Sequence, residues 1–461
     1  MYDAKKENIN NSSNFLLKSD CISDTMYFEM SYQEHIKKHK PAYVPLENIF
    51  EWSIFFDSGR FFIMKLSNRI NAMQFSPIRK LVPFAEEAKA KGKKVYHLNI
   101  GQPDIKTPET FMEAIRNFDE EVIKYANSQG LTEAINSFVQ YYREWNYNFE
   151  KDEILITNGG SEALIFALIA ICNHGDEVIV PEPFYTNYNG FSEFAGVNVV
   201  PFTTKAEDGF HFPSKEALVE KITDKTKAIM LSNPGNPTGV VYTEDEIRML
   251  AEVAKEHDLF IISDEVYREF VYDGLKFFSP VFIDEIKDRV IVIDSISKRY
   301  SACGARIGLI ASKNKELMNQ MMKLAQSRLC VPTLEMVGAA NLINTPKSYL
   351  EEVFVEYQNR RDILYKKLQE IDGVICEKPT GAFYVVVKLP IKSGEDFAKW
   401  LLTDFDVDNK TVMVAPAEGF YATEGLGRDE IRISYCLNCE ALEDAMDILG
   451  KAIVEYKKIE K

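Results

Sequence analysis

One lysine follows an apolar run at the point where a buried strand should end. The run "RVIVI" (residues 289–293) leads into "DSISKRYSACGARIG" (residues 294–308), which contains Lys298. Burial lowers the pKa of a lysine, and the resulting neutral amine can act as a nucleophile or a base. Ser295, Ser297 and Arg306 could hold a phosphate group near this amine. The alternative is a lysine that extends its amine to solvent.

A carboxylate ends a second apolar run. Asp264 follows "LFII" in the stretch "SDEVYREF", and Tyr267 comes three positions later. A carboxylate buried at the end of a strand requires a partner. The alternative is a carboxylate that caps the start of a helix.

Two turns follow two further strand-like runs. After "EILIT", Gly159 and Gly160 permit a tight turn and a helix starts near Ser161, which predicts free N–H groups that attract an anion. After "KAIMLS" comes "NPGNPTG" (residues 233–239), an ordered turn in which Asn236 can direct an amide at a ligand. Plain structural turns are the alternative at both places.

An arginine lies inside a later apolar run. Arg432, in "EIRISYC", suits a carboxylate because a guanidinium can bind both oxygens at once. A structural salt bridge would explain it equally well. Together, these strand ends supply an anion site, an acid, an asparagine, a tyrosine and a lysine, which is what a phosphorylated cofactor with an aldehyde would need.

The elements that must position these residues alternate along the chain. Leu131, Ala134, Ile135, Phe138 and Tyr142 recur at helical spacing, and they predict a helix in "LTEAINSFVQYYREW". Short Val/Ile-rich runs alternate with other helix-sized segments from "EILIT" to "IGLIAS". This alternation predicts an α/β protein with a mostly parallel, buried sheet, which binds ligands at the carboxyl ends of its strands.

The sequence predicts a division of the chain into four regions. Residues 1–63 read as an N-terminal extension of uncertain order, and residues 64–112 as an N-terminal arm that includes part of a small domain. Residues 113–345 hold the large cofactor-binding domain. A long charged helix and three strand-like runs then predict a smaller α+β domain at residues 346–461.

Composition excludes several classes of function. The 461 residues carry a net charge of −16, which disfavours nucleic-acid binding. No stretch of about 20 uncharged apolar residues occurs, so no membrane span is expected. The seven cysteines include one C-x-x-C, Cys436 and Cys439, without a second pair or a nearby histidine, so no metal site is expected. The scattered thiols and the absence of a signal-peptide pattern predict a cytoplasmic protein.

The motifs "NPGNPTG", "SDEVY", "SISKRYSACGARIG" and "EIRISY" closely resemble the class I/II aminotransferases, fold type I enzymes that use pyridoxal 5′-phosphate. The resemblance covers roughly residues 67–458, and "SPIRKLVPFAEEAKAKGKKVYHLNIGQPDIKTP" is similar to the aspartate/aromatic branch. It implies a large domain with a mostly parallel seven-stranded sheet in an α/β/α sandwich, plus a smaller α+β domain.

The resemblance also implies residue roles. Lys298 matches the lysine that forms a Schiff base with the cofactor, Asp264 the acid that pairs with its ring nitrogen, and Tyr267 the phenol near its 3′-oxygen. The remaining cofactor-binding positions are Gly160, Ser161, Glu162, Tyr185, Asn236, Ser295 and Arg306. Gly101, Asn236 and Arg432 match substrate-binding positions, with Arg432 holding the α-carboxylate.

Two aromatic positions carry further implications. Tyr185 matches the residue that stacks on the cofactor ring, where many members have Trp or Phe. Tyr125, in "KYANSQG", resembles the tyrosine that reaches the phosphate in the neighbouring subunit, which implies a homodimer with shared active sites.

The implied reaction is a ping-pong transfer of an amino group from an L-amino acid to a 2-oxo acid such as 2-oxoglutarate. Aspartate is the expected donor, and Phe184, Tyr185 and Tyr188 keep aromatic donors open. Two alternatives remain: a pyridoxal-phosphate-dependent C–S lyase acting on cystathionine-like substrates, and, more distantly, an aminotransferase-like regulator that senses a ligand.

Overall fold

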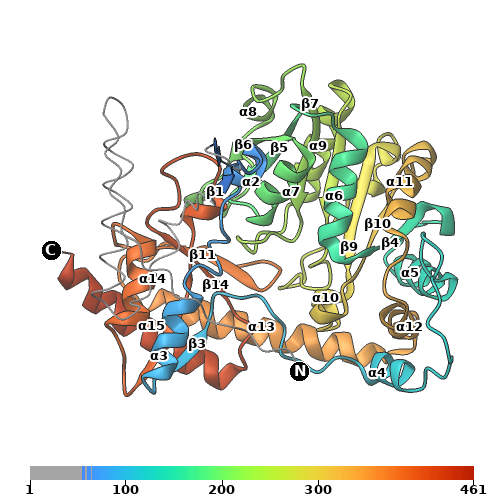
Figure 1. Cartoon of the computed structure of the whole chain (residues 1–461). Coiled ribbons are helices and arrows are strands. Elements are labelled where there is room, and N and C mark those ends of the chain that lie inside the picture. Colours follow the sequence, from blue (N-terminus) through green and yellow to red (C-terminus); the bar gives the residue numbers. More distant parts are fainter. Residues whose placement is uncertain (1–53, 58–59, 64, 461) are drawn as a thin grey trace, which may run out of the picture. The chain divides into compact units, whose positions relative to one another are not determined.

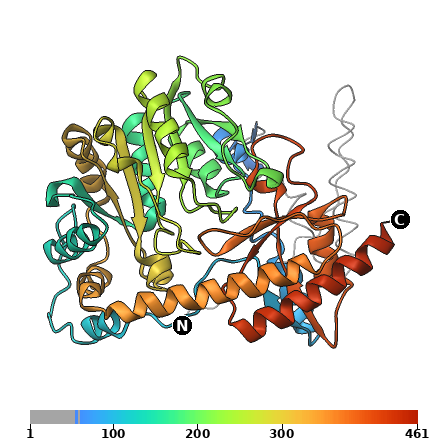
Figure 2. The same ribbon diagram turned by 180° about the vertical axis from the view of Figure 1, so that it is seen from behind.

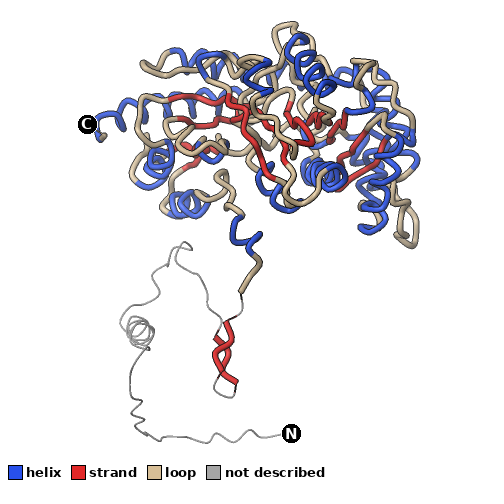
Figure 3. Tube along the Cα trace, turned by 90° about the horizontal axis from the view of Figure 1, so that it is seen from above, coloured by secondary structure: helices blue, strands red, loops and turns tan. Residues whose placement is uncertain are grey.

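The computed structural model describes residues 54–57, 60–63 and 65–460. The chain divides into two compact units, Met1–Ser67 and Asn68–Lys461. Most of the predicted N-terminal extension, residues 1–63, lies outside the described residues. Its described part is a pair of antiparallel strands, β1 (Ile54–Asp57) and β2 (Arg60–Ile63), drawn in red in Figure 3. The domain boundaries predicted at residues 112 and 345 stay predictions.

A seven-stranded sheet is the centre of the second unit (Figure 1). Its spatial order is β4-β10-β9-β8-β7-β5-β6, and only β10 runs antiparallel to its neighbours. All seven runs predicted as strands form it, so the prediction of a mostly parallel sheet is confirmed. The strands are β4 (Ile154–Asn158), β5 (Glu177–Glu182), β6 (Asn198–Thr203), β7 (Thr226–Ser232), β8 (Phe260–Asp264), β9 (Val290–Ser295) and β10 (Ile307–Ala311).

Helices cover both faces of this sheet, because its strands are apolar on both sides. On one face, α6 (Gly159–Ile171), α7 (Asn187–Ala195) and α11 (Lys315–Arg328) share a core with Ile291 and Ile293. On the other face, α5 (Thr132–Glu144), α9 (Glu244–Glu256) and α12 (Thr333–Asn341) share a core with Val290 and Val292. Alternate residues of one strand therefore face different helix layers, and the α/β/α sandwich is confirmed.

A second group of elements forms a smaller sheet and its helices. Strands β11 (Tyr384–Lys388), β14 (Glu430–Ser434) and β13 (Ala415–Pro416) make an antiparallel sheet. Nearby, β3 (Lys94–His97) pairs in parallel with β12 (Lys410–Met413). The long helix α13 (Lys347–Gln369) packs on α15 (Cys439–Ile459), and Figure 2 shows both in front. The remaining α-helices are α2 (Asn68–Ala72), α3 (Val82–Ala90), α4 (Glu109–Arg116), α8 (Lys215–Val219), α10 (Ile296–Arg299) and α14 (Gly394–Thr403).

Local sequence explains where key helices begin. Thr243 and Glu246 form a reciprocal capping box at the start of α9. Ser295 ends β9 and accepts a hydrogen bond from the Ser297 amide, so α10 starts directly after the strand. Lys298 thus lies on a single helical turn fixed to the end of a buried strand.

Among the residues described, none of the helices combines the length and apolarity that crossing a bilayer needs. The six cysteines in this part of the chain are all free thiols. The location of the protein in the cell stays a prediction.

Candidate active site

A cavity of about 670 Å³ collects most of the residues predicted from sequence. Its walls come from the ends of β7, β8 and β9, from the starts of α6 and α10, and from β11 and β14. The predicted residues that line it are Gly101, Gly160, Ser161, Tyr185, Asn236, Asp264, Tyr267, Ser295, Ser297, Lys298, Arg306 and Arg432. Elements far apart in sequence therefore build one site.

Lys298 presents its amine to this cavity from α10. Its Nζ donates a hydrogen bond to the Gly101 carbonyl at 2.9 Å and lies 3.9 Å from Cys303 Sγ. Burial lowers the pKa of Lys298, but the neighbouring Tyr384, Cys303 and Tyr185 outweigh burial and raise it above the ordinary value. The depressed pKa expected from the sequence is therefore wrong for this chain by itself, and two of these neighbours, Tyr384 and Tyr185, come from distant segments. The amine is protonated at neutral pH and must lose a proton before it can act as a nucleophile.

Asp264 is the buried acid of the site. It is 6% exposed, and its Oδ2 accepts a hydrogen bond from the Tyr188 hydroxyl at 2.9 Å. Burial raises the pKa of Asp264 to about 7, against the lowering effect of the Tyr188 hydrogen bond. A cation placed in the cavity beside this carboxyl would stabilise its charged form, so Asp264 is suited to a protonated ring nitrogen.

The opposite end of the site is suited to an anion. Helix α6 begins at Gly159, and no side chain caps its first amides. Arg306 lies in the left-handed region, with φ of 54°, and its guanidinium occupies the space where a side chain at Gly159 would stand. Ser161 and Ser295 line the same end. Free amides at a helix start, a guanidinium and hydroxyls together form a phosphate site.

Arg432 is a buried guanidinium that lies on the cavity wall. It is 1% exposed, its Nη1 donates to Asn236 Oδ1 at 3.2 Å, and its Nη2 donates to the Asn99 carbonyl. Its Nε is buried without a hydrogen-bond partner. Within the described residues, Arg432 forms no ion pair with a carboxylate. The structural salt bridge considered for Arg432 is thus not formed, and the guanidinium is left to meet a carboxylate in the cavity.

Two phenols lie together on another wall. The hydroxyls of Tyr267 and Tyr384 are 3.0 Å apart, and the ring of Tyr384 lies 4.6 Å from the Arg432 guanidinium carbon. Tyr384 also fills the space where a side chain at Gly101 would stand. Glycine at position 101 therefore permits the close approach of Tyr384 to the cavity.

Two predicted residues lie elsewhere. The Glu162 carboxylate accepts a hydrogen bond from the Asn158 amide at 2.8 Å and pairs with Arg328 at 3.3 Å, so it faces away from the cavity. Tyr125 is 81% exposed and lies outside the cavity wall of its own chain. Its expected role at a neighbouring subunit stays a prediction.

Sequence reasoning missed several residues of the cavity wall, among them the polar side chains Ser76, Arg79 and Tyr384. Tyr384 stands in a run read only as a strand, although a tyrosine at the first position of a strand could have drawn attention to it. Ser76 and Arg79 belong to a segment whose path was not predicted. The Arg79 side chain is exposed, and no hydrogen bond or ion pair of this side chain occurs within the described residues.

The known proteins similar to this chain agree with this chemistry. Residues 93–449 match a family model described as "Aminotransferase class I and II". Aspartate aminotransferase of Bacillus subtilis (strain 168) is 34% identical over 404 residues, which cover 85% of this chain and all of that protein. Aromatic-amino-acid aminotransferase 2 of Thermococcus litoralis is 30% identical over 403 residues, which cover 86% of this chain and all of that protein.

The fold is also similar to solved structures. Aspartate aminotransferase from Thermus thermophilus, in a structure with maleate, superposes with a TM-score of 0.76 at 29% identity. The match covers 85% of this chain and all of that one.

Proposed function

The chain belongs to the class I and II aminotransferases and is a transaminase, and from that membership we propose that Lys298 binds pyridoxal 5′-phosphate covalently. The family depends on this cofactor. The observation that carries the proposal is the convergence of an amine, a buried acid and an anion site on one cavity of about 670 Å³.

The residues of the cavity fit the cofactor at each end. The first turn of α6, with Ser161, Ser295 and Arg306, would hold the phosphate. Asp264 would face the ring nitrogen, Tyr185 the ring, and Asn236 with Tyr267 the 3′-oxygen. Space remains at Gly160, where an added Cβ would meet only ordinary contacts at 3.7 Å and 3.8 Å, from Ile293 and Val266.

When bound, the cofactor supplies the electron sink that lets an amino acid lose its Cα proton. Asp264 would keep the ring nitrogen of the cofactor protonated. The protonated nitrogen favours the ionised form of the Asp264 carboxyl, and the two opposite charges stabilise each other inside the protein. Lys298 Nζ carries the proton, first as a general base at Cα and then as an acid. Its reach to the Gly101 carbonyl, 2.9 Å, shows an amine already directed into the cavity.

Arg432 orients the substrate. Its free Nε and its place beside Asn236 suit the α-carboxylate of an amino acid or a 2-oxo acid. Holding this carboxylate fixes the Cα–H bond relative to Lys298, which lowers the entropic part of the barrier.

The donor we propose is a dicarboxylic amino acid such as aspartate, with 2-oxoglutarate as acceptor. Four cationic side chains line the cavity in the described part of the chain: Arg79, Lys298, Arg306 and Arg432. Lys298 and Arg306 are assigned to the cofactor and Arg432 to the α-carboxylate, so Arg79 is left for a second carboxylate. The names of the relatives and the maleate in the Thermus thermophilus structure support a dicarboxylate, whereas the aromatic relative keeps aromatic donors as the second candidate.

A homodimer with shared active sites is also part of the proposal. Phe75 and Tyr125 are 87% and 81% exposed, and Val122 and Ile123 are each 60% exposed. Large apolar side chains at exposed positions are typical of protein–protein contacts. A second copy that covers the segment around Tyr125 would bring this phenol to the neighbouring phosphate site.

The test of the function uses Lys298→Ala beside Lys276→Ala, an exposed lysine outside the cavity. Borohydride treatment of the cofactor-loaded wild type should fix the mass of the cofactor on the peptide that contains Lys298, and this label should be lost only in Lys298→Ala. Glutamate formation from aspartate and 2-oxoglutarate should fall at least about 10³-fold in the same variant. Labelling at another lysine, or release of pyruvate and ammonia from cystathionine by a protein that forms no glutamate from aspartate and 2-oxoglutarate, would contradict the proposal.

A further inference from the structure

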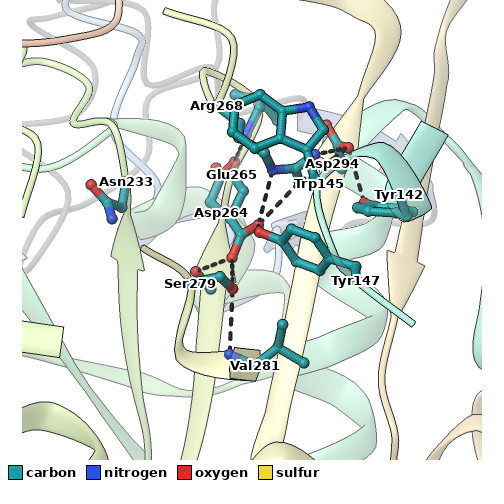
Figure 4. Close-up of polar contacts among 12 residues, drawn as sticks. Tyr142, Trp145, Tyr147, Asn233, Asp264, Glu265, Arg268, Ser279, Val281 and Asp294 are labelled. Carbon is teal, nitrogen blue, oxygen red and sulfur yellow. Dashed lines mark hydrogen bonds and ion pairs between the residues drawn. The ribbon is translucent and has the colours of Figure 1, made fainter. Parts of the chain in front are cut away.

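Four charged side chains are buried on the face of the sheet opposite the cavity: Glu265, Arg268, Asp294 and Arg299. Each is at most 1% exposed. None of the four lines the cavity. We refer to these four residues as the ion network; Figure 4 shows three of them with their polar contacts.

The β8 end of the ion network is Glu265. Its Oε1 accepts hydrogen bonds from Ser263 at 2.9 Å and Ser279 at 2.6 Å, and its Oε2 accepts from Tyr147 and, at 3.0 Å, from Arg268. Every oxygen of this carboxylate is satisfied, so its position is fixed from several directions.

The β9 end is Asp294. Its Oδ1 accepts hydrogen bonds from the Ser295 amide and from Arg299 Nη1, both at 2.6 Å. Arg299 Nη1 also donates to the Ser295 carbonyl at 3.1 Å. The carboxylate and the guanidinium thus hold both peptide groups of Ser295, the residue from which α10 starts.

Arg268 joins the two ends. Its guanidinium lies 3.0 Å from Glu265 and 3.4 Å from Asp294. The rings of Tyr147 and Tyr142 stand 4.9 Å and 5.0 Å from its central carbon, so aromatic faces fill the rest of its surroundings.

The ion network alternates in sequence with the proposed reactive groups. Glu265 directly follows Asp264, and Arg299 directly follows Lys298. Because successive residues of a strand face opposite sides, Asp264 points to the cavity while Glu265 points to the ion network. In β9, Ser295 and Asp294 divide in the same way, and a backbone hydrogen bond from the Glu265 amide to the Ile293 carbonyl, 2.9 Å, links the two strand ends.

We propose that the ion network is a set of positioning residues for the transamination, and that it holds the turn carrying Lys298 at a fixed place relative to Asp264. This inference rests on the proposed function of those two residues. Stability alone does not account for the arrangement, because well-packed apolar side chains stabilise a core as well as a buried ion network does. The paired charges add directional hydrogen bonds, and these hold the peptide groups of Ser295 and the ends of β8 and β9 in place.

The test removes Arg299, whose guanidinium donates hydrogen bonds to the Asp294 carboxylate and to the Ser295 carbonyl. Arg299→Gln loses the charge, and Arg299→Lys keeps it and serves as the rescue variant should the first fold poorly. The control is Arg289→Gln, which breaks a half-exposed ion pair to Asp258, 2.5 Å long, between the opposite ends of the same two strands. The control should behave as wild type, because exposed pairs contribute little.

Two measurements are made on each protein. The first is kcat per mole of bound cofactor, at a temperature well below the midpoint of unfolding, with KM for the amino acid. Arg299→Gln should lower kcat about 10- to 100-fold and change KM less than about twofold, because a small displacement of the reacting amine slows only the chemical step. Arg299→Lys should recover part of the loss.

The second measurement is amide hydrogen exchange of the cofactor-free full chain. In Arg299→Gln, exchange should become faster in peptides covering residues 294–306 and stay unchanged in β4, β5 and β7. A loss of kcat with faster exchange throughout the sheet, a loss with unchanged exchange, or an unchanged kcat would each overturn the inference. Failure of the proposed function is seen separately, since wild-type protein would then show no cofactor-dependent transamination while the exchange data could still be read.

Discussion

At neutral pH the carboxyl of Asp264 is about half protonated in the folded cofactor-free chain, because burial raises its pKa to about 7. An aspartate in the unfolded chain has a pKa of about 3.9. Between pH 5 and pH 7 the unfolded chain has therefore lost this proton while most folded molecules still hold it. Raising the pH across this window lowers the free energy of unfolding.

Asp264→Asn should remove that pH dependence. Without cofactor, the variant should gain about 2–3 kcal/mol relative to wild type between pH 5 and pH 7, as measured by denaturant unfolding. Asp288→Asn, at an exposed position, is the control. If the stabilities of Asp264→Asn and wild type change in parallel with pH, Asp264 does not have a raised pKa.

Arg79 decides the substrate class in our proposal. Arg79→Gln should raise KM for aspartate and 2-oxoglutarate about 10- to 100-fold, the effect of losing one hydrogen bond to a charged group. KM for phenylalanine should change less than about twofold. Steady-state assays of both donors check this.

Lys80→Gln is the matched control for Arg79→Gln, since Lys80 is the next residue and pairs with Glu395 at 2.5 Å instead of lining the cavity. Equal losses with aspartate and phenylalanine would show that Arg79 supports the fold of the arm. Unchanged kinetics with both donors would leave the transaminase in place but refute its dicarboxylate subsite.

At the scale of elements, the anion end of the site depends on how closely β10 approaches α6. A Cβ added at Gly308 would stand 2.6 Å from the Gly160 amide nitrogen, which is backbone and cannot move aside cheaply. Gly308→Ala should therefore displace the first turn of α6 and cost about 1–3 kcal/mol of stability.

The same variant should weaken cofactor binding more than it weakens the fold. Titration of pyridoxal 5′-phosphate should give at least about a tenfold larger Kd for Gly308→Ala. Gly450→Ala is the control, because a Cβ there meets only Ile371 at 3.6 Å within a helix. If Gly308→Ala had a normal Kd and a lowered midpoint of unfolding, the contact between β10 and α6 would support the fold without shaping the anion site.

Elements with a strong local pattern could be predicted from sequence, and those defined by distant partners could not. The seven runs of the large sheet, helix α5 and helix α13 follow from apolar spacing and punctuation. Strand ends then gave Asp264 and Lys298. In contrast, Arg79 lies on the cavity wall because of the course that the N-terminal arm takes, and no local sequence pattern predicts that course.

The ion network shows a second limit of sequence reasoning. Arg268, Asp294 and Arg299 have the residue types of a surface, yet they are buried because they neutralise one another across two strands. The raised pKa of Lys298 has the same origin, since Tyr384 and Tyr185 approach it from other segments. Contacts between segments far apart in the sequence decide both the burial of the ion network and the pKa of Lys298. A single sequence does not show which distant segments come into contact.

At the scale of the whole molecule, the dimer is the main prediction. The chain has a mass of 52.8 kDa, and light scattering should give twice that value for the wild type. A double variant, Phe75→Glu with Ile123→Glu, places charge at two exposed apolar positions and should shift the protein to the monomer mass.

The monomeric variant should also bind pyridoxal 5′-phosphate more weakly, because Tyr125 of a partner could no longer reach the phosphate site. Tyr125→Phe supplies the control, since it should weaken binding without dissociating the dimer. A wild-type chain that scatters light as a monomer while transaminating fully would refute the shared site.

The pairing of β3 with β12 has a consequence for biosynthesis. Lys94 stands opposite Lys410 in this pair, so more than 300 residues must leave the ribosome before β3 finds its neighbour. The large sheet needs only the chain up to Ala311, where β10 closes against β4. A nascent chain arrested between these two points would hold a complete central sheet beside an unpaired N-terminal strand, and that strand is where we expect chaperones to bind.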